Sequence, residues 1–512
     1  MRILLASSEL HPYSKTGGLA DMVAALAKYL AKIGNQVAVV TPLYRGIRER
    51  FPELQRFEWV FGFPLGDEFV RGTVWTARPA PNLTIYFVDQ PRFFDRPGIY
   101  QAPDGDYTDN AERFIFFSKC VVNLARYLPA PPEIVHLHDW QTGLVPLMIR
   151  HQQEREGWGN APRHCLTIHN LAYQGVFPVS AYKLCNLPWD HFTPSRAEFY
   201  GGLNFLKTGI CTADRVTTVS KTYAHEITTP EFGCGLDQVL LERPEPVVGI
   251  LNGVDYEEWN TEQNPHLAAT YSLESLASKE LNKRALQHRF GLDEEPASPL
   301  FVNVSRLVEQ KGADLQLACL EEYLVQGIQF ALLGKGDPVL ETAFLALQRR
   351  FPKQVAVTVG YDHALAHQIE AAGDFFVMPS RFEPCGLNQM YSLRYGTIPI
   401  VRSTGGLEDS VTDARDDAST ADGIKFTDPS PEALSCAFRK ALAIYARPEV
   451  LEFYRTNAMR ADFSWDTVAT NYCRLYEELL ASKPQPQSIT TGVTEKVGGV
   501  VEAEPGVVKP SP

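Results

Sequence analysis

The sequence predicts an α/β protein made of two Rossmann-like domains that face each other. Short runs rich in Val, Ile and Leu alternate with amphipathic stretches along the chain, which is typical of parallel strands covered by helices. The 512 residues exceed what one hydrophobic core usually serves, so we expect two domains of roughly 200 to 250 residues. A Gly-Gly turn before a helical stretch occurs twice, as SKTGGLAD at 14–21 and STGGLED at 403–409. The repetition predicts that each domain contributes one such turn to a shared cleft.

Two series of apolar runs are the expected strands. The first series is RILLAS, QVAVVTP, LTIYFVD, EIVHLHD, HCLTIHN and RVTTVS. The second is VVGILNG, LFVNVSR, QFALLGKG, QVAVTVGY, DFFVMPS, IPIVRS and GIKFTD. Between them, near residue 245, LERPEPVVG supplies prolines that suit neither a helix nor a central strand. We therefore expect domains at 1–245 and from 246 onward, and a disordered tail at 483–512, which is rich in Pro, Gly, Ser and Thr.

The composition narrows the possible partners and the compartment. A net charge of -13 disfavours a nucleic-acid partner. No apolar stretch approaches the roughly 18 to 20 residues that span a bilayer, and the N-terminal MRILLASSELHPYSK predicts a buried first strand instead of a signal peptide. The nine cysteines show no CxxC pair and no zinc-like Cys/His spacing, which indicates reduced thiols. These features predict a cytoplasmic protein without membrane attachment.

The Gly-Gly turns and a pair of cations have the chemistry of anion binding. Glycine lets the backbone approach a ligand closely, and a following helix N-terminus offers free amides. Lys15 stands beside the first turn. Arg306 and Lys311, in NVSRLVEQKGAD, stand where a predicted strand ends and a helix begins. Two cations at that position suit a diphosphate.

Several motifs together resemble one enzyme family, bacterial glycogen synthase and plant starch synthase, which are ADP-glucose-dependent glucosyltransferases. The motifs are KTGGLAD at 15, HDWQTG at 138, TIHNLAYQG at 167, LNGVD at 251, SRLVEQKG at 305 and SRFEPCGLNQMYSLRYGTIPIVRSTGGLED at 380. The similarity runs in order from residue 1 to about 480. It implies the GT-B glycosyltransferase fold, with an acceptor and catalytic domain at 1–245, a nucleotide-sugar domain at 246–464 and a helix at 465–481 that crosses back to the first domain.

The resemblance also implies roles for individual residues. Those matching the catalytic positions of the family are His169, Glu383, Arg306 and Lys311. Those matching the nucleotide-sugar-binding positions are Lys15, Gly17, Gly18, Asp139, Asn252, Tyr361, Cys385, Leu387, Asn388, Thr404, Gly405 and Gly406. The expected reaction is transfer of glucose from ADP-glucose to the non-reducing 4-hydroxyl of an α-1,4-glucan, with retention and with no metal or cofactor. ADP-glucose versus UDP-glucose preference stays open.

Two departures from the family pattern are visible. Many bacterial members carry Thr where this chain has Asn388, so a hydroxyl contact to phosphate becomes an amide contact. Many related retaining transferases have a second Glu eight positions after the first, where this chain has Tyr391. Glu383 is therefore expected to act without a partner carboxylate.

Three alternatives remain. A metal-dependent glycosyltransferase would use an Asp-x-Asp motif, which Asp104 and Asp106 supply within PDGDYTD. A glucan phosphorylase would share the fold and the polymer but requires a lysine Schiff base to pyridoxal phosphate. A non-catalytic glucan-binding protein would keep the fold without turnover, although the presence of Lys15, His169 and Glu383 argues against it.

Overall fold

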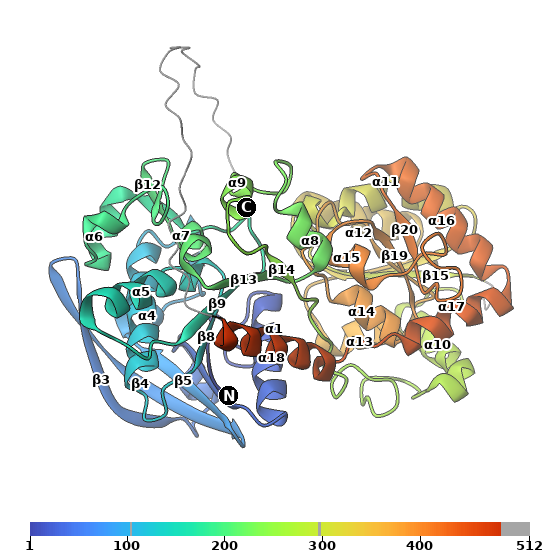
Figure 1. Cartoon of the computed structure of the whole chain (residues 1–512). Coiled ribbons are helices and arrows are strands. Elements are labelled where there is room, and N and C mark those ends of the chain that lie inside the picture. Colours follow the sequence, from blue (N-terminus) through green and yellow to red (C-terminus); the bar gives the residue numbers. More distant parts are fainter. Residues whose placement is uncertain (103–104, 295–297, 483–512) are drawn as a thin grey trace, which may run out of the picture.

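The computed structural model describes residues 1–102, 105–294 and 298–482, which form two lobes joined side by side (Figure 1). Each lobe contains one large, mainly parallel β-sheet packed with helices. The predicted tail at 483–512 lies outside the described residues. Two α/β lobes of this kind confirm the predicted fold class.

The sheet of the N-terminal lobe has nine strands. Their spatial order is β14 (Val248–Gly249), β13 (Arg215–Thr218), β9 (Arg163–Ile168), β8 (Ile134–His138), β1 (Arg2–Ala6), β2 (Gln36–Pro42), β5 (Leu83–Asp89), β4 (Glu68–Ala80) and β3 (Gln55–Leu65). All neighbouring pairs from β14 to β5 are parallel, and β4 and β3 add an antiparallel hairpin at one edge. The strand order reverses between β1 and β8, which makes this the topological switch point of the sheet.

The sheet of the C-terminal lobe has six parallel strands. Their order is β17 (Val355–Val359), β16 (Gln329–Gly334), β15 (Leu300–Val304), β18 (Phe375–Met378), β19 (Ile398–Arg402) and β20 (Ile424–Phe426). In chain order this is 3-2-1-4-5-6, the Rossmann arrangement, with its switch point between β15 and β18.

Two elements differ from the expected strand series. The run VVGILNG was expected to open the second series, but its strand β14 pairs with β13, with Thr217 opposite Val248, so it completes the first sheet. The β3–β4 hairpin was not expected. The sequence feature that could have predicted it is the alternation of Phe57, Trp59, Phe61 and Phe63 in β3, which is typical of a strand with one face packed.

Helices surround both sheets (Figure 1). In the N-terminal lobe they are α1 (Gly18–Lys32), α2 (Ile47–Arg50), α3 (Pro91–Phe94), α4 (Asn110–Tyr127), α5 (Val145–Glu156), α6 (Tyr182–Cys185), α7 (Phe205–Thr212), α8 (Lys221–Glu226) and α9 (Asp237–Leu241). In the C-terminal lobe they are α10 (Lys279–Phe290), α11 (Ala313–Leu324), α12 (Pro338–Arg350), α13 (His363–Ala372), α14 (Asn388–Arg394), α15 (Gly405–Ser410), α16 (Pro431–Tyr445) and α17 (Pro448–Arg460).

The remaining elements are short. The strands are β6 (Gln101–Ala102), β7 (Gly105–Asp106), β10 (Val176–Pro178), β11 (Glu198–Phe199) and β12 (Gly202–Asn204). The 3-10 turns are η1 (Trp140–Thr142), η2 (Val179–Ala181), η3 (Trp189–His191), η4 (Leu273–Ser278) and η5 (Glu309–Lys311). In the part of the chain that the structure describes, no helix is long and apolar enough to cross a membrane.

The last helix, α18 (Trp465–Ala481), crosses back and packs against α1 of the N-terminal lobe (Figure 1). Its apolar face joins the core of that lobe, and the Trp465 ring lies 6.5 Å from Tyr29 between centroids. The chain therefore passes between the lobes twice. The two passages lie side by side, because Val254 N donates to Phe463 O at 2.7 Å. We expect any movement of the lobes to hinge at this paired crossing.

Candidate active site

A cleft of about 1520 Å³ lies between the lobes. It is lined by the loops that follow the parallel strands of both sheets, and both switch points open into it. In open α/β sheets, ligands bind outside the carboxyl ends of the strands at the switch point. The topology thus brings the ligand-binding edges of both sheets, the carboxyl ends of their strands, into one site.

The loop after β1 forms one wall of the cleft. Gly17 precedes α1, and Lys15 pairs with Asp21 in the first turn of that helix at 2.7 Å. The buried Glu9 carboxylate accepts bonds from Thr16 Oγ1 at 2.6 Å and from Gly17 N at 3.3 Å. A side chain added at Gly17 would meet nothing within 4 Å, so the space above this turn is open to a ligand.

The ends of β8 and β9 place three polar residues beside this wall. His138 Nδ1 and His169 Nε2 are 3.1 Å apart, and His169 N donates to Asp139 Oδ1 at 2.7 Å. Desolvation lowers the pKa of His169 to about 3, so its imidazole is neutral. Burial raises the pKa of Asp139 to about 7, although the amides of His169 and Asn170 oppose this rise.

Asp139 also has an unusual backbone. Its φ of 57° and ψ of -172° fall in a region that is essentially restricted to glycine. A non-glycine residue held in this conformation costs of order 1–3 kcal/mol, and such residues cluster at active sites. The strained conformation keeps the Asp139 carboxylate under the His169 backbone at the cleft.

The switch point of the C-terminal lobe gathers charged side chains. Lys311, in the turn after β15, contacts the Glu383 carboxylate, which also accepts a bond from Ser380 Oγ at 3.1 Å. Glu383 is only 7% exposed. Arg306 lies nearby on the same loop, where its guanidinium donates to Gln310 Oε1 at 3.4 Å and otherwise faces the cleft.

The other predicted cleft residues differ in their surroundings. Asn252 is buried at the cleft, and its Oδ1 has no hydrogen-bond partner in the protein. Tyr361 is 79% exposed, which leaves its ring face free. Burial raises the pKa of the Cys385 thiol to about 12, so it stays protonated. Leu387 and Asn388 line the same wall at the start of α14.

The second Gly-Gly turn differs from the expectation. Thr404, Gly405 and Gly406 do not line the cleft, because their polar groups are already used: Thr404 Oγ1 and Gly405 N donate to Glu226 Oε1 at 2.9 and 3.0 Å. Gly406 N donates to Glu383 O at 3.0 Å. A Cβ at Gly405 would lie 2.0 Å from Glu383 O. These glycines therefore let the loop that carries Glu383 pack closely, and they hold that loop in place.

Some cleft residues were not foreseen. Glu9 and Asp21 both line the cleft, and the signal that could have found Glu9 is its position in the loop directly after the first strand. For the alternative Asp-x-Asp motif, Asp104 lies outside the described residues. Asp106 is exposed in β7 and lines the cleft.

Two opposed Rossmann-like lobes with both switch points open to one cleft define the class of GT-B glycosyltransferases. Comparisons with known proteins agree. Residues 2–242 match the starch synthase catalytic domain, and residues 286–457 match the glycosyl transferases group 1 domain. A solved catalytic domain of starch synthase IV from Arabidopsis thaliana superposes with a TM-score of 0.84 at 33% identity, covering 94% of this chain and 99% of that one.

Curated relatives are similar along nearly their whole length. Glycogen synthases of Anaeromyxobacter sp. (strain Fw109-5) and Myxococcus xanthus are 47% and 46% identical, and each alignment covers 94% of this chain and 100% of the relative. A sucrose-phosphate synthase from Thermosynechococcus elongatus, 18% identical with a TM-score of 0.60, shares the fold. This chain belongs to the glycogen and starch synthase family, and it is a glucosyltransferase.

Proposed function

We propose that this enzyme transfers glucose from ADP-glucose to the non-reducing 4-hydroxyl of an α-1,4-glucan, with retention at the anomeric carbon. The observation that carries the proposal is the convergence in one cleft of two cations, Arg306 and Lys311, with the neutral His169 from the opposite lobe. The starch synthase IV neighbour was solved bound to ADP and acarbose, a nucleoside diphosphate and a saccharide. The proposed donor and acceptor are ligands of the same two kinds.

In this proposal Arg306 and Lys311 meet the charge of the departing diphosphate. Negative charge grows on the leaving oxygens as the bond from glucose to diphosphate breaks, and preorganised cations stabilise it more in the transition state than in the ground state. Lys15 and the turn at Gly17 and Gly18, above which the space is open, approach from the other lobe. This proposed diphosphate-binding cradle therefore consists of protein groups alone and needs no metal ion.

Glu383 is proposed to stabilise positive charge on the sugar ring or to orient its hydroxyls, without forming a covalent intermediate. Retaining glycosidases pair a carboxylate nucleophile with a second carboxyl group. Here the residue eight positions after Glu383 is Tyr391, whose ring stacks on Trp259 at 3.8 Å between centroids. The neutral His169 can donate or accept a hydrogen bond to a glucose hydroxyl without adding charge.

The adenine is proposed to lie against Tyr361. Its exposed ring at the cleft offers a stacking face that is not used within the protein. We also propose that the enzyme acts in the cytoplasm, because all nine cysteines are free thiols, which suits a reducing compartment.

The direct test is incubation of the protein with labelled ADP-glucose and glycogen. Label should enter the polymer and should be released by a hydrolase specific for α-1,4 bonds. UDP-glucose in parallel measures the nucleotide preference, and inorganic phosphate with glycogen should yield no glucose 1-phosphate. Activity should persist after exhaustive EDTA treatment. If chelation abolishes turnover and magnesium or manganese restores it, the metal-free cradle is rejected. Asp104 and Asp106 then become the candidate metal ligands.

A further inference from the structure

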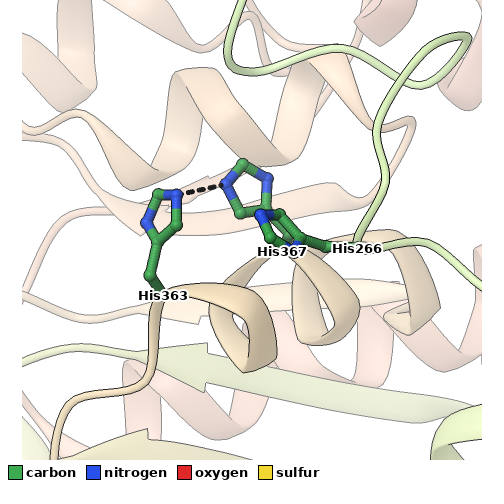
Figure 2. Close-up of side chains that lie close together, drawn as sticks. All are labelled: His266, His363 and His367. Carbon is green, nitrogen blue, oxygen red and sulfur yellow. Dashed lines mark hydrogen bonds between the residues drawn. The ribbon is translucent and has the colours of Figure 1, made fainter.

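Three histidines gather where the segment after the hinge meets α13. His363 and His367 stand one helical turn apart on α13, and His266 approaches from the segment between β14 and η4 (Figure 2). Their ligand nitrogens all lie within 4.8 Å of one another. Within residues 1–102, 105–294 and 298–482, this is the one group of three or more His, Cys, Asp or Glu side chains with such spacing.

The spacing of the imidazoles suits a tetrahedral metal ion. A zinc ion with Zn–N bonds of about 2.0–2.1 Å places two ligand nitrogens about 3.3–3.4 Å apart. The Nε2 atoms of His363 and His367 are already 3.3 Å apart. Glu258 Oε1 lies 3.6 Å from His363 Nε2, outside the group of three, and would complete a set of three imidazoles and one carboxylate after a movement of its side chain. His266 is partly exposed and needs only a small side-chain movement to join them.

The second nitrogen of His367 is held by neighbours, as is usual for a histidine that binds metal. His367 Nδ1 lies 2.8 Å from the Tyr395 hydroxyl and 3.0 Å from Asn264 Nδ2. Ligation through Nε2 requires the tautomer with the proton on Nδ1, which then donates to the Tyr395 oxygen, and the 3.0 Å contact with the Asn264 amide, a donor, must open. The Trp259 ring stacks on the imidazole at 4.1 Å between centroids. These contacts hold the ring with Nε2 directed at His363.

Asn264 ties two of the three ligands together. Its Oδ1 accepts a bond from His266 N at 2.9 Å, while its Nδ2 donates to Tyr395 OH at 2.8 Å.

We propose that His266, His363, His367 and Glu258 form a binding site for a divalent transition metal of the zinc type. Imidazole ligands favour zinc, cobalt and nickel over magnesium and calcium, which prefer oxygen ligands. Glu258 and His363 line the same cleft as Arg306 and Lys311, but the proposed ligands come from α13 and from the segment after the crossing, so the role of the site is to hold that segment on α13. The sequence, judged by its Cys/His spacings and the Asp104/Asp106 motif, predicts no metal, and this proposal departs from that prediction; His266 is distant in the sequence from His363 and His367, so the three do not form a local motif.

Metal binding can be measured directly with the full-length protein after chelation and desalting. Cobalt(II) should bind with one equivalent per chain and give the visible bands of a four-coordinate ion, and zinc should displace it. Magnesium should not compete. His266→Gln and Glu258→Gln should each weaken zinc binding by at least the roughly 10- to 100-fold that loss of an outer-shell partner typically costs.

His288→Gln is the matched control, because His288 also pairs with a carboxylate, Glu294 at 3.1 Å, but is exposed and belongs to no group of three or more possible ligands among the described residues. It should bind cobalt as the wild type does. Zinc should also raise the melting temperature of the wild type and not that of His266→Gln.

Melting of the metal-free variants shows whether they fold. If His266→Gln does not fold, His363→Gln replaces it, since that side chain is 44% exposed at the surface of the site. Failure of the wild type to bind cobalt, or equal binding by the wild type and the triad variants, would overturn the proposal. Either result leaves the proposed glucosyl transfer untouched, because that reaction is assayed separately after chelation.

Discussion

Lys311 and Glu383 contact each other at the C-terminal switch point, and Lys15 contacts Asp21 at the N-terminal one. Each of these lysines therefore has a carboxylate partner before a substrate is present. A bound diphosphate would compete for both lysines and leave the carboxylates near the sugar. The local pairing keeps the charges of an empty cleft balanced, which limits the cost of partly burying them.

The first prediction concerns the two cations. Arg306→Ala and Lys311→Ala should each lower kcat by about 10²- to 10³-fold, or about 2.7 to 4 kcal/mol, the typical cost of losing one charge-stabilising group. Steady-state kinetics with ADP-glucose and glycogen measure this. Arg350→Ala is the control, because Arg350 forms an exposed pair with Glu321, neither residue lines the cleft, and the variant should keep its kcat. Near wild-type kcat in both cleft variants would contradict the proposed cradle.

The second prediction concerns Glu383. Glu383→Gln should lower kcat far more than it raises KM, because the lost interaction belongs to the transition state. The amide has nearly the shape of the carboxylate, and Ser380 Oγ can still donate to its oxygen, so the fold should be retained. Mass spectrometry of the native enzyme with donor should detect no glucosyl ester on this residue. A trapped ester would show that Glu383 is a nucleophile.

At the scale of elements, the two Gly-Gly turns have similar sequences and different roles. In the first turn, the space above Gly17 is empty, so glycine there serves the approach of a ligand. In the second, Gly405 has a φ of 44° and its missing Cβ makes room for Glu383 O. The same Gly-Gly sequence before a helix thus serves ligand binding in the N-terminal lobe and backbone packing in the C-terminal lobe.

The third prediction compares the two turns. Gly17→Ala should keep the melting temperature and raise the KM for ADP-glucose, because its methyl group would occupy only the ligand space. Gly405→Ala should lower the melting temperature and kcat together, because its methyl group would displace the loop that carries Glu383. Thermal melts and kinetics of both variants make the comparison. Equal melting temperatures for the two would contradict the assignment of separate roles.

At the scale of the whole molecule, the lobes are linked at two places. The paired crossing at Val254 and Phe463 forms the hinge, and α18 fixes the second passage to the N-terminal core. At a second place, the start of α8 contacts α15, with Thr222 Oγ1 donating to Asp409 Oδ1 at 2.6 Å. Rotation about these contacts would narrow the cleft without breaking either sheet.

The fourth prediction is that the lobes close on ligand binding. Excluding water protects an activated glucosyl group from hydrolysis, which is a common reason for domain closure. Small-angle scattering with ADP and a short glucan should give a smaller radius of gyration than the free enzyme. The glucan alone serves as the control for binding without the nucleotide. An unchanged radius at saturation would contradict closure as a working step.

The sequence by itself determined the fold class, because the alternation of apolar runs and amphipathic stretches is a local pattern that each segment carries. It also determined which strand ends carry Lys15, Asp139, Arg306 and Glu383, since each stands in the loop that follows its strand along the chain. The topology then brings them to one cleft, as a parallel sheet aligns the carboxyl ends of its strands.

Only the tertiary structure decided which distant groups meet. The pairing of β14 with the first sheet depends on its neighbour β13, and the role of Gly405 depends on the backbone of Glu383. His266 joins His363 and His367 across a long stretch of chain. Contacts of this kind arise from the packing of whole elements against each other, and no single segment of the sequence contains the information that specifies them.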